Sequence, residues 1–189
     1  LRNPVCRKLS FTGSTEVGKL VLQAAQGNLK KVSLELGGKS PNIVFQDADI
    51  DLAIPGAANA IFFNHGQCCC AGSRLFVDQR IFDRVVEGVA DHAKNIRVGP
   101  GMDPKTEMGP LVSREQLHRV CGYLDAGLQE GAKVVVGGHR MGDKGYFVEP
   151  TVITNTRRDM KIEQEEIFGP LVTAVPYKDL NEIVAMAND

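Results

Sequence analysis

Three consecutive cysteines, Cys68, Cys69 and Cys70, are the residues of this chain best suited to covalent chemistry. A thiolate is a strong nucleophile, and a nearby helix terminus or backbone N–H lowers the pKa of a thiol from about 8.5. Adjacent side chains point in different directions and no C-x-x-C spacing is present, so we expect no metal site. The triplet lies between an apolar helical pattern and a glycine turn, which favours one nucleophilic thiol, not identified by the pattern, and two small buried cysteines.

Glu35 is the carboxylate whose position best suits a general base. It lies near the end of the otherwise apolar segment 32–36, just before two glycines. Ligands of open α/β sheets bind beyond the carboxyl ends of strands, and partial burial there would raise the pKa of a carboxyl toward a useful range. The alternative is an exposed carboxylate at a strand edge. A second acidic group, Glu163, Glu165 and Glu166, is typical of a solvated face.

Segment 13–19 matches the first seven positions of a phosphate-binding loop, G-x-x-x-x-G-K. The eighth position is Leu20, where Mg²⁺ binding needs Ser or Thr, so a nucleoside triphosphatase is disfavoured. Gly13 and Ser14 still stand where a helix would begin, and the free N–H groups of a helix N-terminus suit a dinucleotide pyrophosphate. An ordinary capped helix is the alternative. His65 lies near the cysteines, but no Asp or Asn partner stands out, which disfavours a thiol protease.

Composition indicates a globular chain without an obvious macromolecular partner. The 189 residues are 43% hydrophobic and 24% charged, with a formal net charge of -1. No basic cluster exceeds Arg157 and Arg158, so nucleic acid and anionic membranes are not expected partners. Five cysteines are an odd number and do not suggest a disulfide framework, which favours a reducing compartment. The chain starts at Leu1 without a signal-peptide pattern, and we expect it to be a fragment of a longer protein.

The elements that must position these residues alternate between strands and helices, which predicts an α/β fold. The first strand, helix and second strand form the pattern of a parallel crossover. Ser113 with Gln116 and Asp179 with Glu182 form capping boxes, and Asp49 or Asp51 can cap another helix. The predicted strands cover residues 5–12, 31–36, 42–45, 75–77, 133–136, 148–154 and 171–175.

Four segments taken together resemble the NAD(P)-dependent aldehyde dehydrogenase superfamily. The segments are FTGST at 11–15, LELGGKSP at 34–41, GQCCC at 66–70 and EEIFGP at 165–170. They occur in the family's order and spacing, and the triple-cysteine form is most similar to the branch of mitochondrial and cytosolic aldehyde and retinal dehydrogenases. The resemblance implies two domains: residues 1–37 as the last βαβ unit of a Rossmann-like cofactor domain, and residues 38–189 as most of a catalytic domain with a mostly parallel sheet flanked by helices.

The resemblance also implies roles for single residues. Cys69 would be the nucleophile and Glu35 the base, with oxidation of an aldehyde to a carboxylic acid through a thiohemiacetal and a thioester. The hydride acceptor would be NAD, with NADP as the alternative. Glu166 would hydrogen-bond the nicotinamide ribose. The residues expected to contact the cofactor are Gly13, Ser14, Leu36, Gly37, Glu166 and Phe168.

Two other functions stay open beside an aldehyde-oxidising enzyme: a non-catalytic fragment or binding module of the same fold, and a cofactor-independent thiol esterase. NADH formation separates the first from the other two. The resemblance implies a small aldehyde substrate, a homodimer or homotetramer, and a cytoplasmic location, with the mitochondrial matrix as the alternative. It also places most of the dinucleotide fold and the oxyanion-binding asparagine before Leu1, so we expect this chain alone to be inactive.

Overall fold

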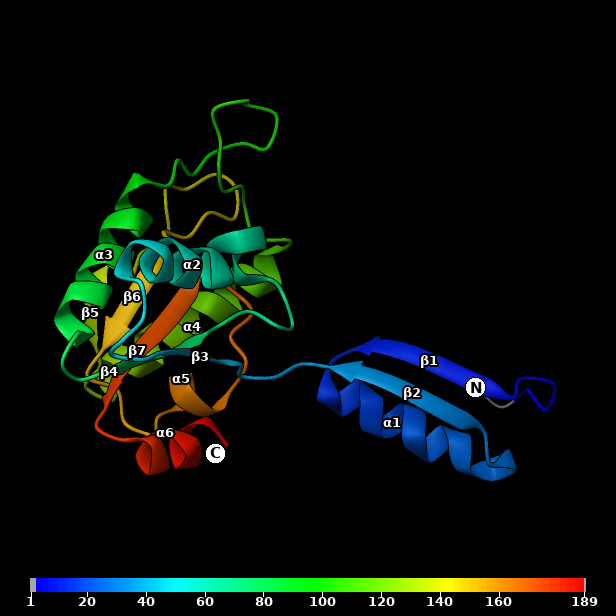
Figure 1. Cartoon of the computed structure of the whole chain (residues 1–189). Helices are drawn as coiled ribbons and strands as arrows, with labels where there is room; N and C mark the ends of the chain where they lie inside the picture. The colour runs from blue at the N-terminus through cyan, green and yellow to red at the C-terminus, as the bar shows by residue number, and fades with distance from the viewer. Residues whose placement is uncertain (1–2, 189) are drawn as a thin grey trace. The chain divides into compact units, whose positions relative to one another are not determined.

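The computed structural model describes residues 3–188 and divides into two compact units, unit 1 with residues 1–38 and unit 2 with residues 39–189 (Figure 1). Unit 1 is the expected strand–helix–strand crossover. Ser14 caps its helix, because the Ser14 side chain accepts a hydrogen bond from the N–H of Val17. The two strands are parallel, and Gly13 is the register partner of Leu36. The elements are β1 (Lys8–Gly13), α1 (Thr15–Ala25), the 3-10 turn η1 (Gln26–Asn28) and β2 (Lys31–Leu36).

Unit 2 is built on a five-stranded sheet with the order β3-β4-β7-β6-β5. All neighbouring strands run parallel except β5 and β6, which are antiparallel. Strand β4 is buried at every position, as expected for a strand covered on both faces. The sheet therefore provides a rigid base for the loops at its edges. The strands are β3 (Pro41–Val44), β4 (Arg74–Asp78), β5 (Lys133–Val136), β6 (Thr151–Thr154) and β7 (Leu171–Tyr177).

Three helices of unit 2 begin at predicted side-chain caps, whereas the helices that begin at residues 82 and 161 have no side-chain cap. Asp49 accepts a hydrogen bond from the N–H of Asp51, Ser113 does so from Gln116, and Asp179 caps the last helix. None of the helices among residues 3–188 is long and apolar enough to cross a membrane. The helices are α2 (Ile50–Phe62), the 3-10 turn η2 (Phe63–Gly66), α3 (Phe82–Asn95), α4 (Arg114–Gln129), α5 (Lys161–Gln164) and α6 (Leu180–Ala187).

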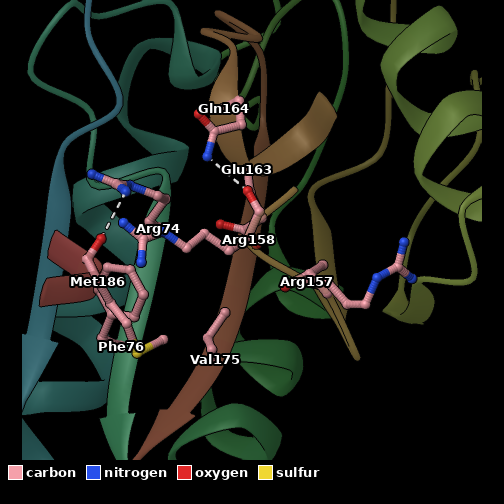
Figure 2. A pocket seen from close by; sticks show the side chains of 9 residues that line it. Arg74, Phe76, Arg157, Arg158, Glu163, Gln164, Val175 and Met186 are labelled. Carbon is pink, nitrogen blue, oxygen red and sulfur yellow. Dashed lines mark hydrogen bonds between the residues drawn. The ribbon is translucent and has the colours of Figure 1, made fainter. Parts of the chain in front are cut away.

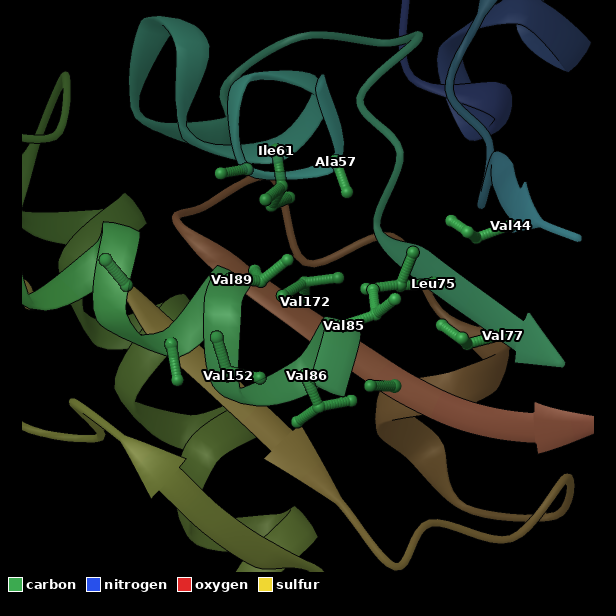
Figure 3. Packing of buried hydrophobic residues seen from close by; sticks show 14 of the residues in the cluster. Val44, Ala57, Ile61, Leu75, Val77, Val85, Val86, Val89, Val152 and Val172 are labelled. Carbon is green, nitrogen blue, oxygen red and sulfur yellow. The ribbon is translucent and has the colours of Figure 1, made fainter. Parts of the chain in front are cut away.

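The largest hydrophobic cluster of unit 2 packs α2 and α3 against the sheet. Figure 3 shows Ile61 of α2 and Val89 of α3 beside Val172 of β7, and all three are almost completely buried. A second cluster joins α4 and α5 to β6 and β7, around Ile153. These two clusters hold α2 and α4 in place, and the loops that carry the predicted site residues of unit 2 follow α2 or contact α4.

Candidate active site

The cysteines follow a short left-handed turn at the end of α2. Asn64, His65 and Gly66 have φ angles of 50°, 59° and 68° in η2. Left-handed backbone is costly for residues with a Cβ. At Gly66 a Cβ would lie 2.0 Å from the carbonyl oxygen of Gly169, so only glycine fits. The turn redirects the chain from α2 toward the cysteine triplet.

The three cysteines lie outside the hydrophobic core. Cys69 and Cys70 are exposed and Cys68 is half-buried, so the prediction of two buried cysteines was wrong. The reason is local: Ala71 N–H donates to the Cys68 carbonyl in a tight turn that keeps the segment at the surface. The sulfurs of Cys68 and Cys70 are 3.3 Å apart. The backbone N–H of Cys70 lowers the pKa of the Cys68 thiol, and the Cys68 sulfur raises the pKa of Cys70.

His65 does not pair with a cysteine. Its Nε2 accepts a hydrogen bond of 2.9 Å from the N–H of Gly109, and its Nδ1 lies 3.2 Å from the side-chain nitrogen of Gln67. The Cys–His arrangement of a thiol protease is therefore not formed by this ring. The sequence gives no signal for these contacts, because the partner Gly109 lies 44 residues away.

A second segment, residues 165–169, carries the predicted cofactor residues Glu166 and Phe168. Helix α4 holds its backbone: Gln116 donates to the carbonyls of Ile167 and Phe168 at 3.0 and 2.7 Å. Arg119, one turn further along α4, donates to the Glu166 carbonyl at 2.7 Å. Phe168 has a φ of 59°, so these contacts stabilise a costly conformation. The sequence predicted a capping box in which the Gln116 side chain returns to the cap, and this was wrong, because that side chain donates to residues 167 and 168. The contact of Arg119 was not predicted from the sequence.

Tyr123 extends the same face of α4 by another turn. Its hydroxyl donates a hydrogen bond of 2.6 Å to Glu165. Burial, followed by this hydrogen bond to a carboxylate, raises the pKa of Tyr123 to about 12. Residues at i, i+3 and i+7 share one helix face, which explains why α4 can contact four consecutive residues of this segment, 165–168. The segment and the left-handed turn then meet where Gly66 lies against the Gly169 carbonyl.

The predicted solvated face at residues 163–166 was wrong for Glu163. Its side chain is buried, and one of its carboxylate oxygens lacks a hydrogen-bond partner. The ammonium of Lys39 is also buried and also lacks a hydrogen-bond partner. Burial lowers the pKa of Lys39 to about 8, and the charge of Glu163 opposes that change. Arg74 donates to the Lys39 carbonyl at 2.9 Å and to the carbonyl of Met186 at 3.2 Å. Figure 2 shows Arg74, Glu163 and Met186 around the small cavity, of about 40 Å³, that they line.

Unit 1 carries the remaining predicted residues at one edge of its sheet. Gly13 ends β1 and Ser14 is the cap before α1, while Glu35 and Leu36 end β2 and Gly37 follows it. Because the strands are parallel, their carboxyl ends meet at the same edge, which is where ligands of α/β sheets bind. The Glu35 side chain is exposed in unit 1, so the partial burial considered for a general base is not provided by β2 and α1.

Comparison with known proteins decides the family. The sequence profile described as "Aldehyde dehydrogenase family" matches residues 1–189. The chain belongs to the aldehyde dehydrogenase family. It is 54% identical over 182 residues to an aldehyde dehydrogenase of Emericella nidulans, covering 96% of this chain and 37% of that protein. It is 49% identical over 183 residues to mouse (Mus musculus) retinal dehydrogenase 2, covering 96% of this chain and 35% of that protein.

Solved aldehyde dehydrogenases share the fold of the chain. The NAD+ complex of the Bacillus cereus enzyme matches with a TM-score of 0.95 and 49% identity, covering 97% of this chain and 37% of that one. A Staphylococcus aureus betaine aldehyde dehydrogenase in complex with NAD+ matches with a TM-score of 0.92 and 44% identity, covering 96% and 37%. The resemblance to the family and the expected α/β fold are thus confirmed. The chain spans little more than a third of the length of these aldehyde dehydrogenases.

Proposed function

We propose that these 189 residues are the segment of a longer NAD-dependent aldehyde dehydrogenase that carries its nucleophile, Cys69, and its general base, Glu35. The family match over residues 1–189 carries the proposal. The position of Cys69 supports it, since its exposed side chain follows a turn that packs against the segment of Glu166 and Phe168. The unit boundary after Gly38 supports a cofactor-domain tail at 1–37 and a catalytic domain at 38–189.

Unit 1 has suitable groups for a dinucleotide. The first turn of α1 has N–H groups without partners inside the helix, beside Gly13 and Ser14, and they suit the pyrophosphate of NAD. Leu36 and Gly37 follow at the neighbouring strand end, and from unit 2 Glu166 and Phe168 would contact the nicotinamide side. NAD+ in the related Bacillus cereus and Staphylococcus aureus structures supports NAD over NADP. When bound, NAD supplies the hydride acceptor.

Cys69 and Glu35 divide the chemistry between two half-reactions. The Cys69 thiolate adds to the aldehyde carbon and forms a thiohemiacetal alkoxide. The alkoxide re-forms its C=O bond as the hydride leaves, and a thioester on Cys69 remains. Glu35 then accepts a proton from water as the water oxygen attacks the thioester carbon. The C–S bond breaks, and the carboxylic acid and the Cys69 thiolate are released.

The proposal extends to the assembly and the location of the full-length enzyme. The full-length enzyme is a homodimer or homotetramer that acts on a small aldehyde in the cytoplasm or the mitochondrial matrix. All five cysteines are free, which fits a reducing compartment. Size-exclusion chromatography with light scattering measures the assembly, and a monomer would contradict it.

The full-length protein tests the function directly. With NAD and a series of aldehydes, we expect equal amounts of NADH and carboxylic acid. Iodoacetamide labelling and peptide mapping should modify Cys69 before Cys68 and Cys70, and preferential labelling of either neighbour would remove the assignment. Ester hydrolysis without NAD and without NADH formation would instead favour a thiol esterase. A folded protein with neither activity would favour the binding module.

A further inference from the structure

His65 connects the cysteine segment to a distant loop, residues 109–112. Its Nε2 accepts the Gly109 N–H at 2.9 Å, and the neighbouring side chain of Gln67 accepts the Val112 N–H at 3.0 Å. The two side chains also meet, with 3.2 Å between His65 Nδ1 and Gln67 Nε2. Two residues within three positions of Cys68 thus contact both ends of one loop.

These contacts constrain the protonation of the His65 ring. The Val112 N–H fixes the oxygen of the Gln67 amide, so the amide NH₂ faces Nδ1. A neutral imidazole has one acceptor nitrogen, and the shorter contact, to the fixed backbone N–H of Gly109, assigns it to Nε2. An imidazolium has N–H groups at both positions. Protonation would therefore place an N–H on Nε2 against the N–H of Gly109.

The backbone at His65 needs such an anchor. Asn64, His65 and Gly66 are consecutive left-handed residues, a conformation that costs about 1–2 kcal/mol per residue with a Cβ. Asn64 contributes one local contact, from its side-chain nitrogen to the Gln67 carbonyl at 2.8 Å. The contact of His65 with Gly109 is the one that ties the middle of the turn to another part of unit 2.

We propose that neutral His65 is a positioning residue of the active site: by accepting the Gly109 N–H it holds the left-handed turn that presents Cys69. The inference rests on the proposed role of Cys69. Burial lowers the pKa of His65 below its ordinary value of 6.5, which keeps the ring neutral at neutral pH. Because the folded-state pKa is the lower one, this contribution to stability is complete above pH 6.5 and is lost as the pH falls through the folded-state pKa.

The titratable groups on the segments around the His65 ring have other partners or form no hydrogen bond with it. Its own segment carries only the thiols of residues 68–70, and Glu107 and Arg114 flank the facing loop. Glu107 pairs with Arg97 at 3.4 Å. Within residues 3–188, no charged side chain forms a hydrogen bond or an ion pair with the His65 ring. Glu165 and Glu166 lie on the neighbouring segment 165–169, where Glu165 accepts a hydrogen bond from Tyr123.

Two variants separate the acceptor from the backbone preference. His65→Gln keeps an acceptor that reaches as far as Nε2 but does not titrate. His65→Asn suits the left-handed turn but is too short to reach Gly109. His118→Gln, at an exposed histidine of α4, is the matched control. The readouts in the full-length protein are amide hydrogen exchange at Gly109 and the alkylation rate of Cys69 relative to Cys121, both from pH 5 to 8 and corrected for intrinsic rates.

We expect Gly109 protection and the Cys69 rate in the unmodified protein to change together as His65 titrates. His65→Gln should remove this pH dependence and keep the protection measured at pH 8, whereas His65→Asn should lose about tenfold in protection at every pH. Equal protection in His65→Asn and the unmodified protein would overturn the proposal, and so would an unchanged pH profile in His65→Gln, even if His65→Asn fails to fold. If the full-length protein forms no NADH, the proposed function fails, but the hydrogen exchange of Gly109 and the alkylation rate of Cys69 can still be measured.

Discussion

The two units hold their proposed site residues in different ways. In unit 1, Gly13 and Glu35 lie at the ends of regular parallel strands, and their placement follows from one local crossover. In unit 2, Cys69 and Phe168 lie on irregular segments, which are held in place by hydrogen bonds between residues 44 to 52 positions apart. Irregular backbone needs such long-range support, and a well-packed scaffold can provide it.

The hydrophobic cores of the two units differ in the same sense. Unit 2 has three buried clusters on both faces of its sheet. Among residues 3–38 of unit 1, the buried apolar side chains are Val21 and Ala25, while Leu20 and Leu29 are exposed. A unit of this size rarely folds alone, because below about 40 residues too little surface is buried. Regular elements thus place the residues of unit 1, but their stability requires further packing.

The largest expected effect concerns the loop-borne nucleophile. Cys69→Ala in the full-length enzyme should lower kcat by on the order of 10⁴-fold or more, because no thioester can form. Cys68→Ala and Cys70→Ala are the matched controls and should keep most of the activity. Steady-state NADH formation measures all three. A larger loss in either control than in Cys69→Ala would assign the nucleophile to that neighbour.

The strand-borne base should have a smaller and more selective effect. Glu35→Gln removes the group that accepts the proton of water, so thioester hydrolysis should slow by about 10²- to 10⁴-fold while hydride transfer is largely kept. Stopped-flow absorbance should then show an NADH burst before slow turnover. Equal loss in the burst and in the steady state would give Glu35 another role.

Because the two hydrophobic cores differ, shortening one buried side chain should lower the stability of the two units of the 189-residue chain by unequal amounts. Ile153→Ala should destabilise unit 2 by about 2–5 kcal/mol, since Ile153 is completely buried in the second cluster. Val21→Ala should leave the unfolding transition of unit 2 unchanged. It should lower the stability of unit 1 by about 1 kcal/mol or less, because few buried side chains surround Val21 and they can relax into the space. Urea titration followed by hydrogen exchange resolves the two units. If both variants lower the stability of unit 2 by similar amounts, the two units unfold together.

The sequence predicts local features well and long-range contacts poorly. The caps at Asp49, Ser113 and Asp179 could be identified because their hydrogen bonds span two or three residues. The burial of Glu163 could not, since it depends on packing near Lys39, more than a hundred residues earlier in the chain. The role of His65 as an acceptor depends in the same way on Gly109.

The smallest expected effect tests one charge pair that belongs to unit 2 alone. At the end of β4, the side chain and the backbone N–H of Arg80 donate to Asp78 at 2.8 and 3.0 Å. The side-chain hydrogen bond from Arg80 is the main cause that lowers the pKa of Asp78 from 3.8 to about 2. The folded-state pKa is the lower one, so this stabilisation is complete above pH 3.8 and is lost as the pH falls from 3.8 through 2.

Arg80→Met should therefore move the acid unfolding of unit 2 to higher pH. The shift should be small, roughly a few tenths of a pH unit, because the backbone N–H of residue 80 still donates to Asp78. Arg84→Met, at an exposed arginine of α3, is the matched control and should change nothing. Circular dichroism during acid titration gives the midpoint, and hydrogen exchange in β1 and β2 should stay the same. A shift in unit 1 equal to that in unit 2 would show that the two units share one acid transition, which contradicts the difference in their stabilities.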